Sequence, residues 1–457
     1  MKRTAIALVA LAGCASPPEP PSIYRETGRA SAHLIAPRPE YPGFGAAVGR
    51  EPIPWSASSL AGDFTELMFF TEWGEAAPRL LRWERPVSVA LAGAELSAYR
   101  ADVAGLIARL RAGIPGLEIT LIAGESGDIT LRSAPAAEMA RTAPDALCFF
   151  APFKGDWPAF KAASSRGARF WDGLERLDAV TIFLPAHAAP HEIRACMEEE
   201  ITQALGPSND ILRLEDSIFN DDNAQGKVTA FDLLMLRILY APTLISGMGA
   251  EEAQRAALLT LRRAGPLGAK QRRRAPEDAD YADFMTRAET SDDPADRALW
   301  AESAIGVARG FDPEDHRLGA ALTEAGHYAF FDGRDQEALA LMREAETLFV
   351  LALGPESLRL AALRGDIGAV LAQIGHPAEA LAALDRAVPV LAAQADGWRL
   401  AHALRWRALS LAALGRGREA AVDAARALEW AAYVYGLDSA AALSWRRDFA
   451  ALSLAPA

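Results

Sequence analysis

Four columns of small residues recur in the last third of the chain and limit how this part can fold. Each column holds one residue per unit, and successive units are 42 and 40 residues apart. Within a unit the small residues fall at offsets 0, 7, 12 and 19, and the glycine at the second offset is typical of a helix that ends in a left-handed turn. The columns are Gly326, Gly368 and Ala408; Gly333, Gly375 and Gly415; Ala338, Ala380 and Ala420; and Ala345, Ala387 and Ala427.

These offsets resemble the tetratricopeptide repeat (TPR), whose small positions mark where two antiparallel helices touch. The period is longer than the usual 34 residues and resembles the longer repeats of kinesin light chain. The resemblance implies an all-α TPR-like solenoid over 280–457, led by a degenerate helix pair at about 279–310. Such a stack presents a concave face to a protein or peptide partner. A nonrepeating helical bundle is the alternative.

The first residues, "MKRTAIALVALAGC", are typical of an export signal. Lys2 and Arg3 precede an apolar run that is too short to span a membrane. The run ends in a tetrapeptide that resembles the bacterial lipobox, which implies a signal peptide at 1–13 and lipid on Cys14. Ala15 after the cysteine implies the outer membrane, and residues 14–54 form a proline-rich tether and extension. An ordinary secretory signal is the alternative.

Charge argues against nucleic acid as a partner. The formal net charge is −13, whereas phosphate contacts need a basic face. One basic run, "KQRRR" at 270–274, falls in an expected linker at 263–279. We expect this run to be solvated, and contact with anionic lipid is the alternative.

The cysteine count favours a disulfide. If Cys14 carries lipid, Cys148 and Cys196 remain as an even pair in an oxidising compartment. We therefore expect a Cys148–Cys196 disulfide, with two buried thiols as the alternative.

Residues 55–262 mix strand and helix patterns and predict an α+β domain. Strand patterns occur at 85–93, in "LEITLIAG" and "GDITLRSA", and at 177–185. Helical spacing covers 97–114, and Pro190 is suited to open a further helix. This last helix is expected to run through Leu205 and to end at Gly206.

That helix carries "CMEEEITQALGPSND" (196–210), which resembles the zinc-protease motif HExxHxxGxxH without its histidines. Glu199 and Gln203 stand at the first two ligand positions, and Glu200 stands at the position of the catalytic base. Asn209 occupies the third ligand position and is followed by Asp210. The order strand, helix, strands, motif helix resembles the metzincin clan of zinc endopeptidases.

Two downstream segments extend the metzincin resemblance. "DSIFND" (216–221) resembles the turn below the metal, with Ser217 and Ile218 kept and Phe219 in place of methionine. "VTAFDLLMLRILYAP" (228–242) resembles the third metzincin helix. The stretch from about 85 to 250 also resembles a domain of unknown function of proteobacterial envelope lipoproteins. The fold implied is a metzincin-like mixed sheet with an active-site-type helix.

The substituted motif offers only oxygen ligands, so zinc is not expected and no cofactor is required. Calcium or magnesium would suit an oxygen set, to which Asp210, Asp216, Asp221 and Asp222 could add. Without a metal, adjacent carboxylates could provide a general acid. The plainest alternative is that Gln203 and Asn209 hydrogen-bond the turn while the glutamates face solvent. His187 and His191 also have ligand-like spacing, but a surface-loop position is expected for both.

Two functions follow from these patterns. The first is a binding scaffold on the periplasmic face of the outer membrane, lipid-anchored at Cys14, with a catalytically silent protease-like domain and a repeat array for protein partners. The second is a peptidase-like hydrolase that uses Glu200 with an oxygen-ligated metal or with none. We favour the first, in which the chain is not an enzyme.

Overall fold

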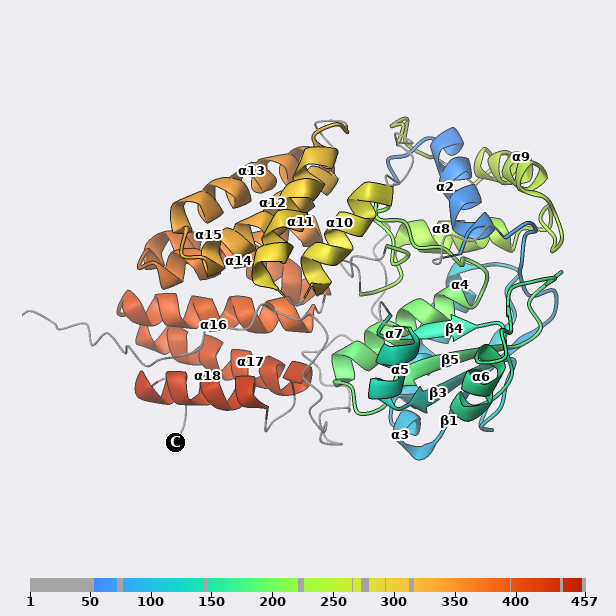
Figure 1. Cartoon of the computed structure of the whole chain (residues 1–457), viewed down its shortest axis with the longest axis horizontal. Helices are drawn as coiled ribbons and strands as arrows, with labels where there is room; N and C mark the ends of the chain where they lie inside the picture. Colours follow the sequence, from blue (N-terminus) through green and yellow to red (C-terminus); the bar gives the residue numbers. More distant parts are fainter. Residues whose placement is uncertain are drawn as a thin grey trace, which may run out of the picture.

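The protein consists of a mixed α/β body and a helical array that lie side by side in a computed structural model (Figure 1). The expected signal peptide (1–13), the lipidation site Cys14 and the tether up to residue 52 lie outside the described residues. The described residues are 53–71, 77–143, 146–220, 226–264, 266–272, 279–291, 293–311, 316–394, 396–435 and 439–453.

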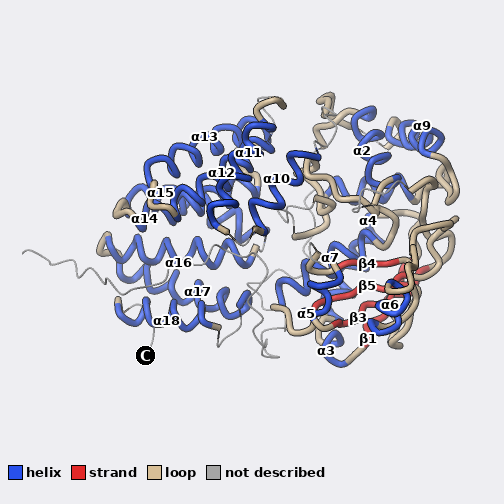
Figure 2. The backbone as a smooth tube through the Cα atoms, in the orientation of Figure 1, coloured by secondary structure: helices blue, strands red, loops and turns tan. Residues whose placement is uncertain are grey.

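Among these residues, a five-stranded sheet forms the centre of the first body (Figure 2). The strand order is β2-β1-β3-β5-β4. Neighbouring strands are parallel except for β4, which pairs antiparallel with β5 at one edge. The strands are β1 (Val87–Ala92), β2 (Ile119–Leu121), β3 (Ile129–Ala134), β4 (Phe149–Ala151) and β5 (Val180–Pro185).

Both faces of the sheet are covered, as expected for parallel strands that are linked by helices. Alternate residues of β5 enter different cores, because successive side chains of a strand point to opposite faces. Val180, Ile182 and Leu184 enter the main core of the body. Phe183 enters a small aromatic core with Phe149, Trp157 and Phe160.

The helices of the first body lie before, between and after these strands along the chain. Helix α4 connects β1 to β2, and α7 follows β5 and packs against it. Helices α2 and α9 pack against each other at the far end of the body (Figure 1). The helices are α2 (Ala57–Phe69), α3 (Ala94–Ser97), α4 (Arg100–Gly113), α5 (Ala136–Thr142), α6 (Trp157–Ser164), α7 (Pro190–Gln203), α8 (Ala230–Leu239) and α9 (Ala250–Leu261).

The predicted mixed fold of the first body is confirmed. The expected strands form β1, β2, β3 and β5, and the expected helices form α4 and α7 with slightly shorter bounds. Helix α7 ends at Gln203 and not at Gly206. The sequence patterns missed β4, because a three-residue strand is too short to show an alternation.

The second body is a stack of antiparallel helix pairs, in which each helix packs against its neighbours along the chain. Its helices are α10 (Ala279–Thr290), α11 (Pro294–Ala308), α12 (His316–Phe331), α13 (Asp335–Leu353), α14 (Leu358–Gln373), α15 (Pro377–Gln394), α16 (Gly397–Ala413), α17 (Gly417–Tyr435) and α18 (Ala440–Ala451). The first helices of the repeated pairs are α12, α14 and α16, and their second helices are α13, α15 and α17.

The predicted repeat columns lie where the helices of each pair meet. A Cβ added at Gly368 would lie 2.5 Å from Leu384 Cγ, and one added at Gly326 would lie 2.9 Å from Met342 Cγ. Every alanine of the four columns is fully buried. The turn glycines Gly333, Gly375 and Gly415 have φ of 75°, 87° and 76°, in the left-handed region. The TPR-like pairing predicted from these positions is therefore confirmed.

The basic run in the expected linker is only partly as predicted. The side chain of Arg272 is 8% exposed, and its guanidinium lies 3.2 Å from Asp63 Oδ2 and 2.7 Å from Asp216 Oδ1. The same group lies over the ring of Trp55, 4.0 Å from its centre. The expectation of a fully solvated run is wrong for this residue, because the aromatic face and two carboxylates replace its water.

No helix within the described ranges combines the length and the apolar character that a membrane span requires.

Candidate functional site

Helix α7 carries the candidate motif, and its start is built by the sequence around Pro190. Pro190 occupies the first helical turn, where its missing N–H costs no hydrogen bond. The carboxylate of Glu192 accepts the backbone N–H of Ala189 at 2.7 Å. Burial raises the pKa of Glu192 to about 7, although this hydrogen bond opposes the shift.

The chain turns after α7 at Gly206, where its backbone passes close to Leu81 and Leu239. Gly206 has φ of 146°, and a Cβ at this position would lie 2.9 Å from the carbonyl oxygen of Leu81 and 2.5 Å from Leu239 Cδ2. Only glycine fits both the conformation and the space. The chain therefore turns at Gly206, where the glycine of the motif was expected to end the helix.

A disulfide joins α7 to the edge of the sheet. Cys196 of α7 is bonded to Cys148, which directly precedes β4, and their Cα atoms are 6.0 Å apart. The predicted pairing is confirmed. The bond lies one helical turn before Glu199, so the motif is covalently attached to the edge strand.

Four residues were expected at or next to the metal positions, namely Glu199, Gln203, Asn209 and Asp210, and the structure brings Gln203 and Asp210 into contact. Gln203 Nε2 donates to both carboxylate oxygens of Asp210, at 2.9 and 3.0 Å. Asn209 instead donates to the carbonyl oxygen of Glu66 in α2, at 3.0 Å. Glu199 is half-buried one turn before Gln203. The side chains brought together are those of Gln203 and Asp210, whereas Asn209 points to α2.

The expected catalytic base, Glu200, is buried and does not face solvent. Its neighbour Glu198 is also fully buried and forms an ion pair with Arg109 of α4. Glu198 Oε1 also accepts the backbone N–H of Val228 at 3.0 Å. Burial lowers the pKa of Arg109 to about 10. Sequence reasoning missed Glu198, because nothing in three consecutive glutamates indicates which one meets a distant arginine.

The Ser217–Phe219 turn is hydrogen-bonded to Asp232 near the start of α8. Ser217 Oγ donates to Asp232 Oδ1 at 2.6 Å, and the N–H of Ile218 donates to Oδ2 at 3.1 Å. The N–H of Thr229 donates to the same carboxylate at 2.7 Å. Burial raises the pKa of Asp232 to about 6 against these hydrogen bonds. Phe219 is fully buried in the main core.

The other proposed ligands do not gather around the motif. Asp216 accepts hydrogen bonds from Trp55 Nε1 and Arg272 Nη2, at 2.8 and 2.7 Å, and so belongs to the contact with the chain around Arg272. Asp221 and Asp222 lie outside the described residues. Within the described part of the chain, no three His, Cys, Asp or Glu side chains lie close enough together to hold a metal ion.

The two histidines with ligand-like spacing are separated by their surroundings. His187 is exposed, as expected, and has a φ of 67°. His191 is not in a surface loop: it lies in the first turn of α7, with its ring centre 6.3 Å from that of Tyr433 in α17. Burial lowers the pKa of His191 to about 4.

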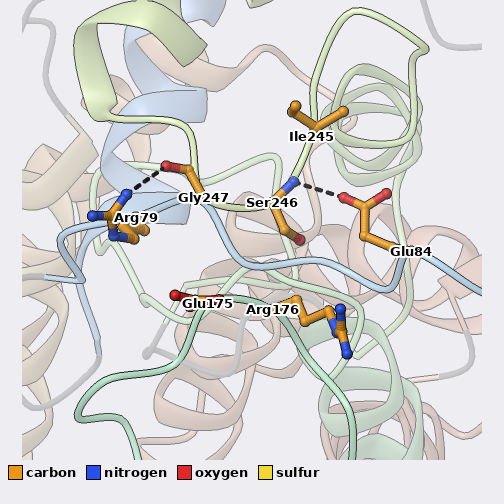
Figure 3. A pocket seen from close by; sticks show the side chains of 7 residues that line it. All are labelled: Arg79, Glu84, Glu175, Arg176, Ile245, Ser246 and Gly247. Carbon is orange, nitrogen blue, oxygen red and sulfur yellow. Dashed lines mark hydrogen bonds between the residues drawn. The ribbon is translucent and has the colours of Figure 1, made fainter.

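A shallow pocket of about 490 Å³ lies away from the motif (Figure 3). Its lining residues precede β1 and β5 or lie in the loop between α8 and α9, whereas α7 follows the other end of β5. In Figure 3, Arg79 donates to the carbonyl oxygen of Gly247 at 3.1 Å, and the N–H of Ser246 donates to Glu84 at 2.6 Å. These exposed polar groups are used in holding the loop at 245–247 and do not form a reactive cluster.

Comparisons with known proteins divide the chain as the structure does. Residues 57–258 match a family model described as a protein of unknown function (DUF2927), and residues 317–393 match a tetratricopeptide repeat model. No curated protein matches the chain.

Two solved structures of nearly identical TPR-like repeats, assigned to a kinesin light chain of Podosopora anserina, are also similar. Each is 15% identical and covers 38% of this chain and 83% of its own, with TM-scores of 0.32 and 0.31. The chain carries a DUF2927 domain followed by TPR-like repeats.

Proposed function

We propose that this protein is a lipid-anchored binding scaffold of the bacterial envelope. Its repeat array recruits a protein partner, and its first domain is a protease-like scaffold without zinc ligands. The observation that carries the proposal is the array itself, whose repeated helix pairs match the TPR model. Stacked helix pairs bury their shared seams and leave extended surfaces that bind other proteins.

In this proposal the partner binds the surface formed by α12, α14 and α16, which we call the first-helix face. His327 of α12 lies 3.3 Å from Asp366 of α14 and 3.6 Å from Glu324. Burial alone would lower the pKa of His327, but its hydrogen bonds to these carboxylates raise it to about 10. Ala369, one turn after Asp366, is half-buried and has a small side chain. A partner segment with polar and charged side chains fits such a surface.

The protease-like part of the proposal is supported by element order and ligand chemistry. The chain runs through β1, α4, β2, β3, β4 and β5 before it enters the motif helix α7, in the order on which the metzincin resemblance rests. Gln203 and Asp210 are in contact at the motif. An amide and a carboxylate there do not provide the nitrogen or sulfur ligands that zinc favours.

A hydrolase is the second candidate, and the contact between Gln203 and Asp210 is the observation that favours it. The carboxylate of Asp210 supplies oxygen atoms of the kind that calcium and magnesium bind, and the Gln203 amide, which donates its N–H to this carboxylate, would have to turn its oxygen toward the ion. Glu200 would act as the general base.

Anchoring through Cys14 gives the scaffold its location. In this proposal the lipidated cysteine holds the chain at the periplasmic face of the outer membrane, and the segment at 14–54 separates the folded bodies from the lipid. Changing Cys14→Ala should release the protein from the membrane fraction and remove the mass of the acyl chains. Unchanged membrane retention of Cys14→Ala would contradict the anchor.

Site-specific photocrosslinking in intact cells tests the array as a partner surface. A photoreactive residue at Ala369 should yield discrete adducts that disappear when Asp366→Arg is added. The matched control is the same residue at Val422, which is 61% exposed on a second helix. Identical adducts from both positions, or adducts that ignore Asp366→Arg, would reject the first-helix face as the binding surface.

Metal content and peptidase activity separate the two candidates. For the scaffold we expect no stoichiometric metal and no peptide cleavage from protein purified from the envelope. Stoichiometric calcium or magnesium, with cleavage abolished by Glu200→Gln and retained by Glu252→Gln on the exposed side of α9, would establish the hydrolase instead.

A further inference from the structure

One segment of the first domain is held from two sides, and we call residues 209–215 the strap. It contains Asp210, which contacts Gln203, and it leads into the Ser217–Phe219 turn. Backbone hydrogen bonds from Ile211 N to Phe219 O, at 3.0 Å, and from Ser217 N to Leu214 O, at 2.9 Å, fold the strap onto the turn. Movement of the strap would therefore move both features.

On one side the strap is fixed to α2. Asn209 donates to the carbonyl oxygen of Glu66 at 3.0 Å. Arg213 lies 2.7 Å from Asp63 and also pairs with Glu66. The side chains of Arg213 and Asp63 are 3% and 1% exposed, so this ion pair is shielded from water. Charges buried in this way hold their partners in defined positions, because separating them leaves an unpaired charge.

On the other side the strap is held by the repeat array. Glu215 Oε1 accepts a hydrogen bond from Arg359 Nε of α14 at 2.6 Å, and Glu215 Oε2 lies 3.6 Å from His316 of α12. The carbonyl oxygen of Leu212 lies 3.2 Å from His316 Nε2. The side chain of Leu212 packs against the core of the array. The starts of two first helices thus hold the strap.

The array also contacts the motif helix directly. The guanidinium of Arg194 in α7 lies between the rings of Tyr99 and Tyr433, 5.4 and 5.3 Å from their centres. It lies 2.9 Å from Asp102, and its Nη1 donates to Tyr433 Oη at 2.8 Å. This contact fixes α17 against α7, so the array touches both the motif helix and the strap that follows it.

We propose that the repeat array is conformationally coupled to the motif through the strap. A shift of α12 and α14 changes the position of Glu215, and the strap passes this change to the Gln203–Asp210 contact five residues earlier. The same path works in reverse, because coupling between two sites is reciprocal. A protein bound to the array changes the motif region to the extent that it favours one arrangement of α12 and α14. Only this trigger rests on the proposed function; the mechanical link does not.

Hydrogen exchange of the full chain, measured by mass spectrometry without any partner, tests the link. Arg359→Ala removes the array's cation from Glu215. We expect backbone amides at 205–219 to exchange on the order of tenfold faster, although they belong to the other body. The matched control is Arg386→Ala in α15, an exposed arginine 3.9 Å from Glu346, which should leave 205–219 unchanged.

A charge exchange completes the test. Glu215→Arg combined with Arg359→Glu should restore slow exchange at 205–219 if the pair transmits the effect. If Arg359→Ala does not fold, Arg359→Lys should show a smaller increase at the same residues. Faster exchange confined to α12–α14, or an equal effect of Arg386→Ala, would overturn the coupling. Either result would leave the partner-binding proposal standing, because no partner is present in the measurement.

Discussion

The first domain and the repeat array pack their helices with different chemistry. In the array, seams of alanine and glycine bring the helices together, and its ion pairs lie mostly toward the surface. In the first domain, buried charges join elements that are far apart in the chain. Asp63 contacts both Arg213 and Arg272, and Glu198 contacts Arg109.

This difference indicates how sensitive each region is to a single substitution. A small-residue seam is repeated, so that one altered unit leaves the others intact. A buried ion pair occurs once, and removal of one partner leaves the other charge without water or a counterion. The first domain should therefore be more sensitive to single substitutions at its charged contacts than the array is at any one seam.

The largest expected effect is that of Asp63→Ala. This change removes the carboxylate shared by Arg213 and Arg272, both buried. Loss of one member of a buried ion pair costs about 3–5 kcal/mol. The free energy of unfolding from urea denaturation should fall by this amount. Glu251→Ala, which removes an exposed partner of Arg255, should change it by less than about 0.5 kcal/mol.

A pH dependence should appear where the two bodies meet. Burial lowers the pKa of His191 to about 4, below its usual 6.5, while Asp396 and Arg194 act in opposite directions. The unfolded chain then binds a proton that the folded chain does not, so stability falls as pH drops from 6.5 to 4. The loss amounts to at most about 3 kcal/mol. When the free energy of unfolding is measured across this pH range, its dependence on pH should be weaker in His191→Gln and unchanged in His187→Gln. An equal pH dependence in the unchanged protein and both variants would contradict a neutral His191 in the folded chain.

An enlarged seam residue should destabilise the array by a moderate amount. Ala380 is fully buried in one of the small-residue columns, and Ala378 is exposed two residues earlier. Overpacking by Ala380→Leu should cost about 1–3 kcal/mol. Urea denaturation of Ala380→Leu and Ala378→Leu compares the two sites, and equal stabilities would argue against a tight seam.

The smallest expected effects have opposite signs at two glycines of the array. Gly375 has φ of 87°, and a Cβ there would meet nothing within 4 Å. Gly375→Ala should therefore cost about 1 kcal/mol from backbone strain alone. Gly306 lies inside α11 with equal space and no positive φ, so Gly306→Ala should stabilise by up to about 1 kcal/mol. Thermal denaturation of both variants should show shifts in opposite directions.

The sequence predicted two kinds of feature well: positions that need a small side chain in every repeat, and the single pair of cysteines. The repeat columns predict the helix pairs, because each position demands a small side chain in every unit. The Cys148–Cys196 bond follows from an even number of remaining thiols. These features need no knowledge of distant contacts.

The motif geometry was harder to predict, because it depends on where the chain turns. Spacing placed Asn209 at the third ligand position after the expected turn at Gly206, but beyond that turn Asn209 donates to the carbonyl oxygen of Glu66 in α2. Asp210, and not Asn209, therefore meets Gln203. The partners of Glu198 and Arg272 are likewise far away in sequence, and local patterns carry no information about them.

The orientation of the array has a consequence for engineering. His316 and Arg359, at the starts of α12 and α14, contact the first domain. The tight glycine turns within each helix pair lie at the opposite ends of these helices and have open space around them. Peptide tags or reporter domains inserted next to Gly333, Gly375 or Gly415 should therefore be accommodated, whereas the same insertions between α13 and α14 would push the two bodies apart.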